Sequence, residues 1–421
     1  MISVEEALEK VLSYSHVLEP ENKPLTESLG QVLAEDIYSD FEIPPLDNSS
    51  MDGYAVQAES TEGASKSSPR LVKILGEVAA GYLSKDKVGP GTAVRIMTGA
   101  PIPDGADAVV QFEDTDEEKR KASAEPLAEI GIMRQVEAGL NIRRAGEDVT
   151  KGSLVLKTGM VLRPQEIGVL ASLGRARVSV IRRPLVAILA TGDELVQLGE
   201  SLPSGKIYNS NTYSLAAQVS RYGGIPKILG IARDNVRDLD AKINLGQDAD
   251  LFLTSAGVST GEYDMVKKVL ARKGEISFVT VNMKPGKPVA FGVLKMGGRT
   301  IPHLGLPGNP VSSMVTFEQF ARPAILKMQG KTNFTKPTIQ AVSEDRVDNK
   351  DGRRVFIRVR VSQRQGRYFA SLAGPQGSGI LTSMTQADGL MVIPENMPQV
   401  VEKGDTVAVQ MLDWIQDLQN G

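Results

Sequence analysis

The sequence predicts a multidomain protein in which a central α/β domain with a mostly parallel sheet is flanked by β-rich regions. Three patterns support this fold class. Between about 69 and 160, short β-like runs such as TAVRIMTG and DAVVQFED are separated by turn residues. From about Arg182 to about 330, strand-like runs alternate with helix-like stretches, which indicates a parallel sheet covered by helices. After about 335, VFIRVRV alternates strictly and turns return, so the tail is β-like.

Composition narrows the class of protein. The chain has 421 residues, of which 41% are hydrophobic, so two to four domains can each bury a core. The net charge is −3 with both signs interspersed, which argues against nucleic-acid or membrane-surface binding. There is no cysteine, and His16 and His303 are the only histidines, which excludes disulfides, cysteine nucleophiles and multi-histidine zinc sites. No apolar leader or membrane-length stretch is present, so we expect a cytoplasmic protein.

Two helices have clear start signals. Ser3 and Glu6 form a capping-box pattern ahead of an amphipathic stretch. Asn309 as N-cap and Pro310 at the first helical position predict a helix that runs to about Met328.

Polar, glycine-bearing loops follow four of the predicted strands in the α/β region. They are TGDEL after LVAILA, AGVSTGEYD after DLFLTS, KPGKP after ISFVTV, and PGNP after IPHLGL. Open α/β sheets bind ligands at the carboxyl ends of their strands. Each loop also has a structural reading as a turn or a helix cap. Because all four fall on one predicted edge, the sequence favours a ligand site there.

The residue types in these loops fit an anionic ligand and a hard cation. Lys284 and Lys287 are held between prolines on what reads as a rigid loop. Backbone N–H groups at the Asn309 helix start suit a phosphate or another oxyanion, and the loop around Ser259 could form a second cradle. Carboxylates on the same edge could hold Mg²⁺; they are Asp193, Glu194, Asp234 and Asp264.

Eight motifs then identify a family resemblance. NSSMDGYAV, TGAPIPDGADAVVQFED, NIRRAGEDV, ATGDEL, TSAGVSTGEYD, KPGKPVAFG, GLPGNPVSS and GPQGSG occur in this order. As a set they are specific, and the chain closely resembles the molybdopterin molybdenumtransferases, the family of bacterial MoeA and the gephyrin E domain, over essentially its whole length. One departure is Ala256-Gly257, where that family usually has paired glycines.

The resemblance implies an elongated homodimer whose clefts use residues of both chains. It implies an N-terminal region over 1–180 with an inserted β-rich module at about 53–145, a three-layer molybdopterin-binding α/β domain over 181–330, and a β-barrel-like domain over 331–421. The implied activity is insertion of molybdate into adenylylated molybdopterin, with Mg²⁺-dependent hydrolysis of the pterin–AMP link and release of AMP. Contact with the adenylyltransferase and with cofactor-accepting enzymes is a further implication.

Motif matching also assigns roles to residues, all of them implied by the resemblance. The catalytic set is Asp52, Thr98, Glu194, Asp234 and Asp264. The substrate-binding set is Ser259, Lys284, Lys287, Pro307, Asn309, Pro310 and Arg353. The Mg²⁺ ligands are drawn from Asp148, Glu194, Asp234 and Asp264.

Two alternative functions stay open on the sequence. The related molybdopterin adenylyltransferase shares the α/β domain type, although it would not need the flanking β modules that carry several motifs here. A scaffold function is the other alternative, because the gephyrin branch also clusters membrane receptors. Molybdate and tungstate, both tetrahedral dianions of similar size, are equally compatible with the motifs.

Overall fold

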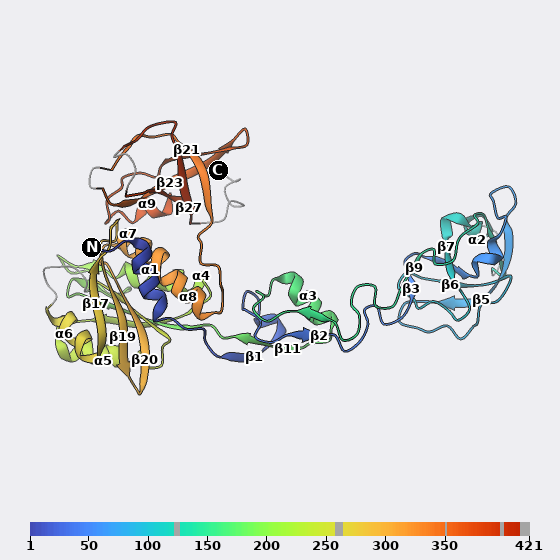
Figure 1. The fold of residues 1–421 in the computed structure, drawn as a ribbon, viewed down its shortest axis with the longest axis horizontal. Helices are drawn as coiled ribbons and strands as arrows, with labels where there is room; N and C mark the ends of the chain where they lie inside the picture. Colours follow the sequence, from blue (N-terminus) through green and yellow to red (C-terminus); the bar gives the residue numbers. More distant parts are fainter. Residues whose placement is uncertain (122–126, 257–263, 350–351, 396–399, 413–421) are drawn as a thin grey trace. The chain divides into compact units, whose positions relative to one another are not determined.

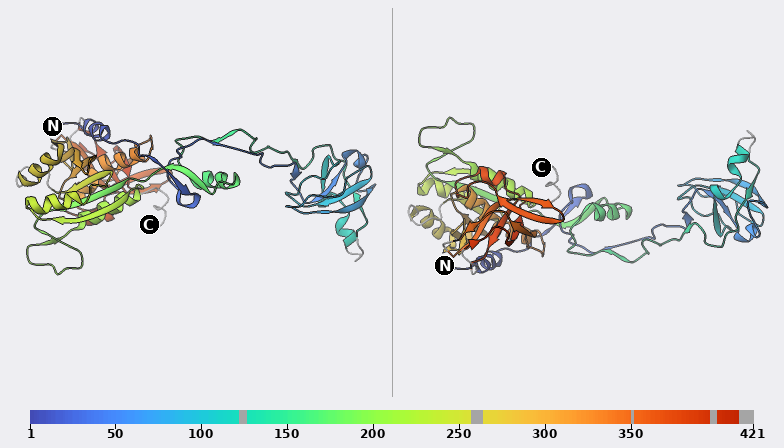
Figure 2. Two further views of the ribbon diagram at one scale, coloured as in Figure 1. Left: turned by 90° about the horizontal axis from the view of Figure 1, so that it is seen from below. Right: turned by 90° about the horizontal axis from the view of Figure 1, so that it is seen from above.

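A computed structural model describes residues 1–121, 127–256, 264–349, 352–395 and 400–412 (Figure 1). The chain forms two compact units, which Figure 2 shows from two further directions. The first unit contains residues 1–34, 159–168 and 175–421, and the second contains 35–158 and 169–174. None of the helices in the described ranges is long and apolar enough to cross a membrane.

The second unit is a β-rich module. Its main sheet runs in the order β7 (Ala108–Gln111), β4 (Gly53–Val56), β6 (Thr92–Ile96), β5 (Arg70–Val78) and β8 (Glu129–Ile132). The interior strand β4 is buried on both faces, because Tyr54 and Val56 pack into one apolar cluster and Ala55 packs into another. Asp52 immediately precedes this strand, so its backbone is anchored by the most buried part of the module.

Shorter elements complete the N-terminal half of the chain. Paired ribbons are β2 (Ile37–Tyr38) with β10 (Leu154–Leu156), β3 (Asn48–Ser49) with β9 (Ile142–Arg143), and β1 (Pro20–Pro24) with β11 (Arg177–Ile181). The helices are α1 (Val4–Ser13), α2 (Glu117–Lys121) and α3 (Pro164–Ser172). In α1 the Ser3 side chain accepts a hydrogen bond from the Glu6 amide, which confirms the predicted cap.

A mixed sheet forms the centre of the first unit. Its described strands run in the order β15 (Ile225–Ala232), β12 (Leu185–Thr191), β16 (Leu251–Ser255), β20 (Arg299–Leu306), β19 (Pro288–Met296) and β17 (Gly274–Thr280). The first four strands are parallel to one another, as the strand–helix alternation predicts. The β20–β19 and β19–β17 pairs are antiparallel. The short connections between these last strands contain no crossover helix, so an antiparallel arrangement is the one they allow.

Helices cover both faces of this sheet and produce three layers. One face packs α1, α4 (Ser210–Arg221) and the helical run α7 (Pro310–Thr316), η4 (Phe317–Ala321) and α8 (Arg322–Met328). The opposite face packs α5 (Val236–Asn244) and α6 (Asp264–Lys273). Strand β12 serves both cores, since Val186 and Ile188 face one layer and Ala187 and Leu189 face the other. The three-layer α/β prediction is therefore confirmed.

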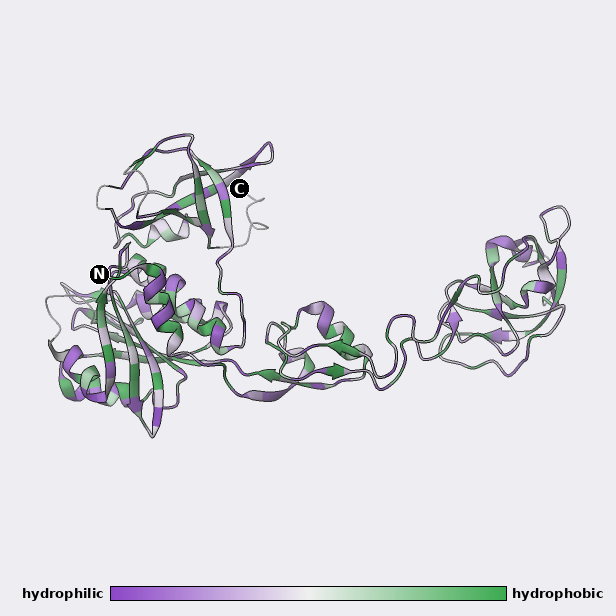
Figure 3. Ribbon diagram, in the orientation of Figure 1, coloured by the Kyte–Doolittle hydropathy of each residue, from purple (hydrophilic) through white to green (hydrophobic). Residues whose placement is uncertain are grey.

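The tail forms a closed five-stranded barrel in the order β23 (Arg354–Arg364), β24 (Arg367–Leu372), β21 (Thr338–Ser343), β27 (Thr406–Met411) and β25 (Gly389–Ile393), with β25 pairing back to β23. Alternate residues of β23 belong to the apolar core of the barrel, as VFIRVRV predicts. Figure 3 colours the ribbon by hydropathy, and green apolar stretches lie along the strands of this domain. The small elements here are β22 (Val347–Asp348), β26 (Val400–Val401) and α9 (Thr382–Thr385).

The outward-facing Phe356 and Arg358 of β23 are also buried. Phe356 joins the core of the α/β layer, so one barrel face is an internal interface of the first unit.

A buried carboxylate fixes the amino-terminal edge of the α/β sheet. Both Asp250 oxygens accept hydrogen bonds from Arg182, at 2.6 and 2.7 Å, and the Leu185 amide donates to the same side chain at 2.8 Å. Burial alone would raise the pKa of Asp250, but these donors outweigh it and hold the pKa below the ordinary value. Because the folded pKa is depressed, Asp250 stabilises the fold above its unfolded pKa of about 4, and this contribution is lost as the pH falls below that value.

Replacing this carboxylate should therefore destabilise the protein. We expect Asp250→Asn to lower the free energy of unfolding by about 2–4 kcal/mol at pH 7, because Arg182 loses its buried partner. The neighbouring Asp248 is an exposed control that pairs with Lys227, and Asp248→Asn should cost less than about 1 kcal/mol. Urea denaturation at pH 7 and pH 3.5 measures both effects, and the gap between wild type and Asp250→Asn should narrow at the lower pH. Equal stabilities of the two variants would contradict this role.

Candidate functional site

The four polar loops do lie at one edge of the sheet. The parallel strands β12, β16 and β20 end there, and β17 ends there too, since two successive antiparallel pairings restore its direction. The loops that follow begin at Gly192, Ala256, Val281 and Pro307. Within the first unit, the carboxyl edge of the sheet is thus the place where the predicted site residues gather.

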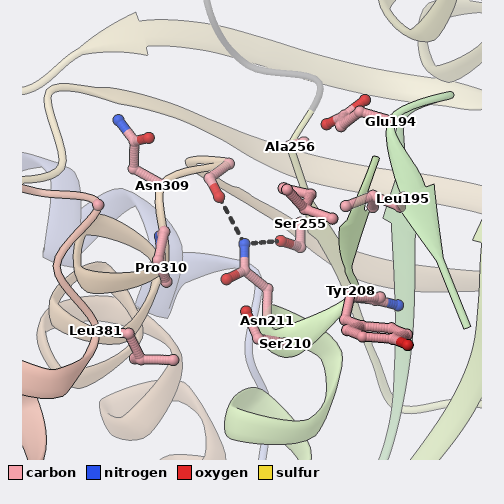
Figure 4. Close-up of a pocket in the computed structure, with 14 residues that line it drawn as sticks. Glu194, Leu195, Tyr208, Ser210, Asn211, Ser255, Ala256, Asn309, Pro310 and Leu381 are labelled. Atoms are coloured by element: carbon pink, nitrogen blue, oxygen red, sulfur yellow. Dashed lines mark hydrogen bonds between the residues drawn. The ribbon is translucent and has the colours of Figure 1, made fainter. Parts of the chain in front are cut away.

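A first pocket of about 600 Å³ opens at this edge (Figure 4). Its lining includes Glu194, Tyr208, Asn211, Ser255, Asn309 and Pro310. Asn309 has extended backbone angles at the N-cap and Pro310 opens α7, as the sequence predicts. The start of α4 and the start of α7 both reach this pocket, so the positive ends of two helix dipoles face it.

A second pocket of about 550 Å³ lies between the α/β layer and the barrel. It is lined by Lys284, Lys287, Arg346 and Arg353 over an apolar floor that includes Phe356. KPGKP is therefore more than a solvent turn. The short strand β18 (Met283–Lys284) pairs in parallel with β23, so the barrel itself holds the lysine loop.

Gly286 is required in this loop. Its φ is +104°, and a Cβ atom there would approach the Thr316 hydroxyl to 2.5 Å. The loop therefore packs closely on α7 at Gly286.

The two pockets meet at the GPQGSG segment of the barrel. Gly377 and Ser378 line the second pocket and Gly379 lines the first. Asn309 Nδ2 donates to Ser378 Oγ at 3.2 Å, and the Val311 amide donates to the Ser378 carbonyl at 3.1 Å. The helix start of the α/β layer and this barrel loop are thus bonded directly to each other.

Arg358, which no sequence pattern marks as a site residue, supports the GPQGSG segment from behind. Its side chain is 1% exposed, and Nη2 donates to the carbonyls of Pro375 and Gly377 at 3.0 and 3.1 Å. Burial lowers the pKa of this guanidinium below its ordinary value. On a barrel strand, an arginine between apolar residues reads as solvent-facing, and only the packing of that face against the α/β layer reveals it.

The acids of the α/β region are only partly brought together. Glu194 lines the first pocket, and its carboxylate lies over Gly192, where a Cβ atom would approach Oε2 to 2.4 Å. The Asp234 amide donates to Asp193 Oδ1 at 3.3 Å, which places these two acid-bearing loops side by side. Ser259 lies outside the described residues, and Asp264 opens α6 without a described side chain. Pro307 is buried between β20 and the Gly308 turn.

No group of three or more His, Cys, Asp or Glu side chains in the described ranges is close enough to hold a metal ion. Hard oxygen ligands of the type that Mg²⁺ prefers are nevertheless present. They are the carboxylates of Glu194, which lines the first pocket, and of Asp193 and Asp234 in the neighbouring loops. The residues therefore fit a cation that keeps several waters and uses only one or two carboxylates.

Asp52, Thr98 and Asp148 belong to the second unit. Asp52 Oδ1 accepts hydrogen bonds from the amide of Thr98 at 2.6 Å and from its hydroxyl at 2.8 Å. The backbone hydrogen bond, followed by the hydroxyl bond, lowers the pKa of Asp52 below its usual value, so the carboxylate is ionised at neutral pH. Two residues assigned from separate motifs are therefore in contact.

A second pair in the same unit has the same local geometry. Asp36 Oδ1 accepts from the amide and the hydroxyl of Thr158, both at 2.8 Å. In both pairs a glycine with positive φ follows the threonine. Asp36 therefore provides a matched control for any substitution of Asp52.

The comparisons with known proteins define the class to which this fold and these pockets belong. Family models match along the chain: MoeA N-terminal region (domain I and II) over 2–174, probable molybdopterin binding domain over 187–327, and MoeA C-terminal region (domain IV) over 340–412. The chain is thus an enzyme of molybdenum cofactor biosynthesis, with the domain set of a molybdenumtransferase.

Relatives and a solved structure agree with this class. Molybdopterin molybdenumtransferase 2 of Mycobacterium tuberculosis is 37% identical over 95% of this chain and 97% of its own length. The enzyme of Haemophilus influenzae is 35% identical over 97% and 98%. The molybdopterin biosynthesis MoeA protein from Pyrococcus horikoshii has a TM-score of 0.81 at 34% identity, covering 98% of this chain and all of that one. The chain belongs to the MoeA family, which confirms the resemblance.

The departure from paired glycines has a structural consequence at the first pocket. Ala256 has φ of +73°, a left-handed conformation that disfavours any side chain. The left-handed conformation costs alanine roughly 1–2 kcal/mol. Glycine would avoid this cost, although its greater conformational entropy in the unfolded state would offset part of the gain. We therefore expect Ala256→Gly to stabilise the protein by about 0.5–1 kcal/mol, measured by urea denaturation. A destabilised Ala256→Gly variant would show that the alanine is not strained.

Proposed function

We propose that this chain inserts molybdate into adenylylated molybdopterin and releases AMP, and that Mg²⁺ assists hydrolysis of the pterin–AMP link. The observation that carries the proposal is the pair of adjoining pockets of different chemistry in the first unit. One offers helix N-termini beside carboxylates, and the other offers four cationic side chains.

In this proposal the first pocket binds the phosphate-bearing organic substrate. Backbone N–H groups at Asn309 and at the start of α4 bind the phosphate oxygens, with no large ordering cost because both helix ends are fixed. Glu194, Asp234 and Asp264 would hold the cation, which neutralises phosphate charge and polarises the bond to be hydrolysed. Glu194, already at the pocket, orients the attacking water or the cation.

The second pocket binds molybdate. Lys284 and Lys287 face it from the rigid loop, Arg353 lines it from the barrel, and the apolar floor lowers the local dielectric. Ser378 lies at the junction, so an oxyanion bound here adjoins the end of the organic substrate that receives the metal. Asp52, Thr98 and Asp148 of the second unit are proposed as further active-site residues.

The same proposal divides the chain into three parts, 1–180, 181–330 and 331–421. The family models that match residues 2–174, 187–327 and 340–412 support this division. It also includes a cytoplasmic location and contacts with the adenylyltransferase and with cofactor-accepting enzymes. The adenylyltransferase alternative finds no support in the flanking matches to MoeA regions.

The direct test of the activity uses the purified chain with adenylylated molybdopterin, molybdate and Mg²⁺. AMP release that requires molybdate and Mg²⁺ is the expected result. An enzyme that instead consumes ATP and molybdopterin and forms pyrophosphate would be an adenylyltransferase, and the proposal would be wrong.

We further propose a homodimer with clefts shared between chains. Asp52→Asn and Lys284→Ala chains should each have low activity, and mixing them under subunit exchange should restore about a quarter of wild-type activity if dimers form at random. Asp36→Asn in place of Asp52→Asn is the control and should be active alone. A monomer by light scattering with full activity, or no restoration in the mixture, would contradict shared clefts.

A further inference from the structure

Asn211 occupies the junction of three elements that form the first pocket. It is the second residue of α4, and its side-chain amide donates to Ser255 Oγ at 2.9 Å and to the Gly308 carbonyl at 2.7 Å (Figure 4). Ser255 ends β16, and Gly308 lies in the turn between β20 and α7. One amide therefore joins residues that lie 44 and 97 positions away from Asn211 in the sequence.

The orientation of this amide is determined by its partners. A backbone carbonyl can only accept, so the nitrogen of Asn211 must face Gly308, and both of its hydrogens are then used. The carbonyl oxygen Oδ1 accepts no hydrogen bond from the described residues, and the residue lines the pocket. Oδ1 is thus an acceptor in a wall where helix N-termini otherwise supply donors.

A second amide supports the same conclusion. Asn209, the N-cap of α4, is 1% exposed and lines the same pocket. Its oxygen accepts from the Thr212 amide, whereas its Nδ2 is buried without a hydrogen-bond partner among the described residues. A buried donor without a partner is costly, and a ligand or a ligand-bridging water would satisfy it.

We propose that Asn211 is a positioning residue of the first pocket: it ties the end of β16 to the turn before α7 and presents Oδ1 to an N–H or O–H group of the substrate. This inference rests on the proposed function, in which the pocket binds a phosphate-bearing heterocycle. Phosphate oxygens are acceptors and cannot pair with Oδ1, so the complementary group belongs to the non-phosphate part of the ligand. A ring edge with N–H groups, or a ribose diol, has this chemistry.

The test compares binding of AMP, a pterin phosphate and molybdate to wild type, Asn211→Ala and Asn211→Asp by titration calorimetry. Asn211→Ala should weaken the binding of one of the two organic probes about 10- to 30-fold, since one or two hydrogen bonds are lost. The probe whose affinity falls identifies which part of the substrate Oδ1 contacts. Asn211→Asp should weaken the binding of this probe further, because an anionic oxygen would face the Gly308 carbonyl.

Molybdate affinity should change less than about threefold in both variants, because the second pocket contains none of the affected groups. Asn244→Ala, which removes an amide from the opposite face of the sheet, should leave all three affinities unchanged. The inference would be overturned if both variants bound both organic probes with unaltered affinity, or if molybdate lost as much affinity as the organic probes. AMP release by the wild type tests the proposed function separately. A change confined to thermal stability would likewise reduce Asn211 to a structural residue.

Discussion

AMP release is expected to fall by at least about 100-fold in Glu194→Gln, the substitution with the largest expected effect, since positioned charges and acid–base groups typically contribute 10²–10⁴ in rate. Glu194 lines the first pocket and its carboxylate is held over Gly192, so glutamine preserves shape and removes only the charge. Asp264→Asn should have the same effect if Asp264 completes the cation site. The measurement is AMP release from adenylylated molybdopterin, with circular dichroism to verify the fold.

Glu200 supplies the control for this experiment. It lies in the same segment between β12 and α4 but does not line the first pocket, so Glu200→Gln should retain near wild-type turnover. Raising the Mg²⁺ concentration should partly rescue Glu194→Gln if the lost group is a cation ligand. Normal turnover in a folded Glu194→Gln protein would remove this residue from the mechanism.

The lysine loop should give the second largest effect. Lys284→Ala or Lys287→Ala should weaken molybdate binding about ten- to a hundredfold, because charge-assisted contacts contribute about 1.5–3 kcal/mol each. Both side chains are exposed at the second pocket, so thermal stability should hardly change. Raised ionic strength should weaken wild-type binding more than binding by either variant.

Lys295→Ala is the matched control for the loop, since Lys295 lies on the strand that follows it and pairs with Glu275 in solvent. Its molybdate affinity should equal that of the wild type. If both loop variants also bound molybdate normally and kept the salt response, the KPGKP segment would serve only to connect β17, β18 and β19.

Patterns of local sequence predicted much of this structure. The strand–helix alternation predicted the parallel strands, and Asn309 with Pro310 predicted the start of α7. The placement of KPGKP and PGNP after strands was enough to put them on one edge. These features depend on neighbours in the chain, and for that reason the sequence alone could reveal them.

Features that depend on packing between distant segments were not predictable in the same way. The antiparallel β17–β19–β20 arrangement follows from short connections rather than from residue periodicity. Arg358 and Asn211 become recognisable only when the barrel and the α/β layer are in place. The separation of the anion-binding residues into two pockets also requires the barrel, whose GPQGSG segment lies between them.

We expect the oxyanion and the organic substrate to bind in separate pockets of the first unit. Anomalous diffraction at the molybdenum edge, from crystals soaked with molybdate and AMP, tests this most directly. We expect a molybdenum peak in the second pocket, with molybdate oxygens within hydrogen-bond distance of Lys284 and Lys287, and AMP phosphate at the Asn309 turn. A molybdenum peak at the Asn309 turn, with the lysine pocket empty, would contradict it.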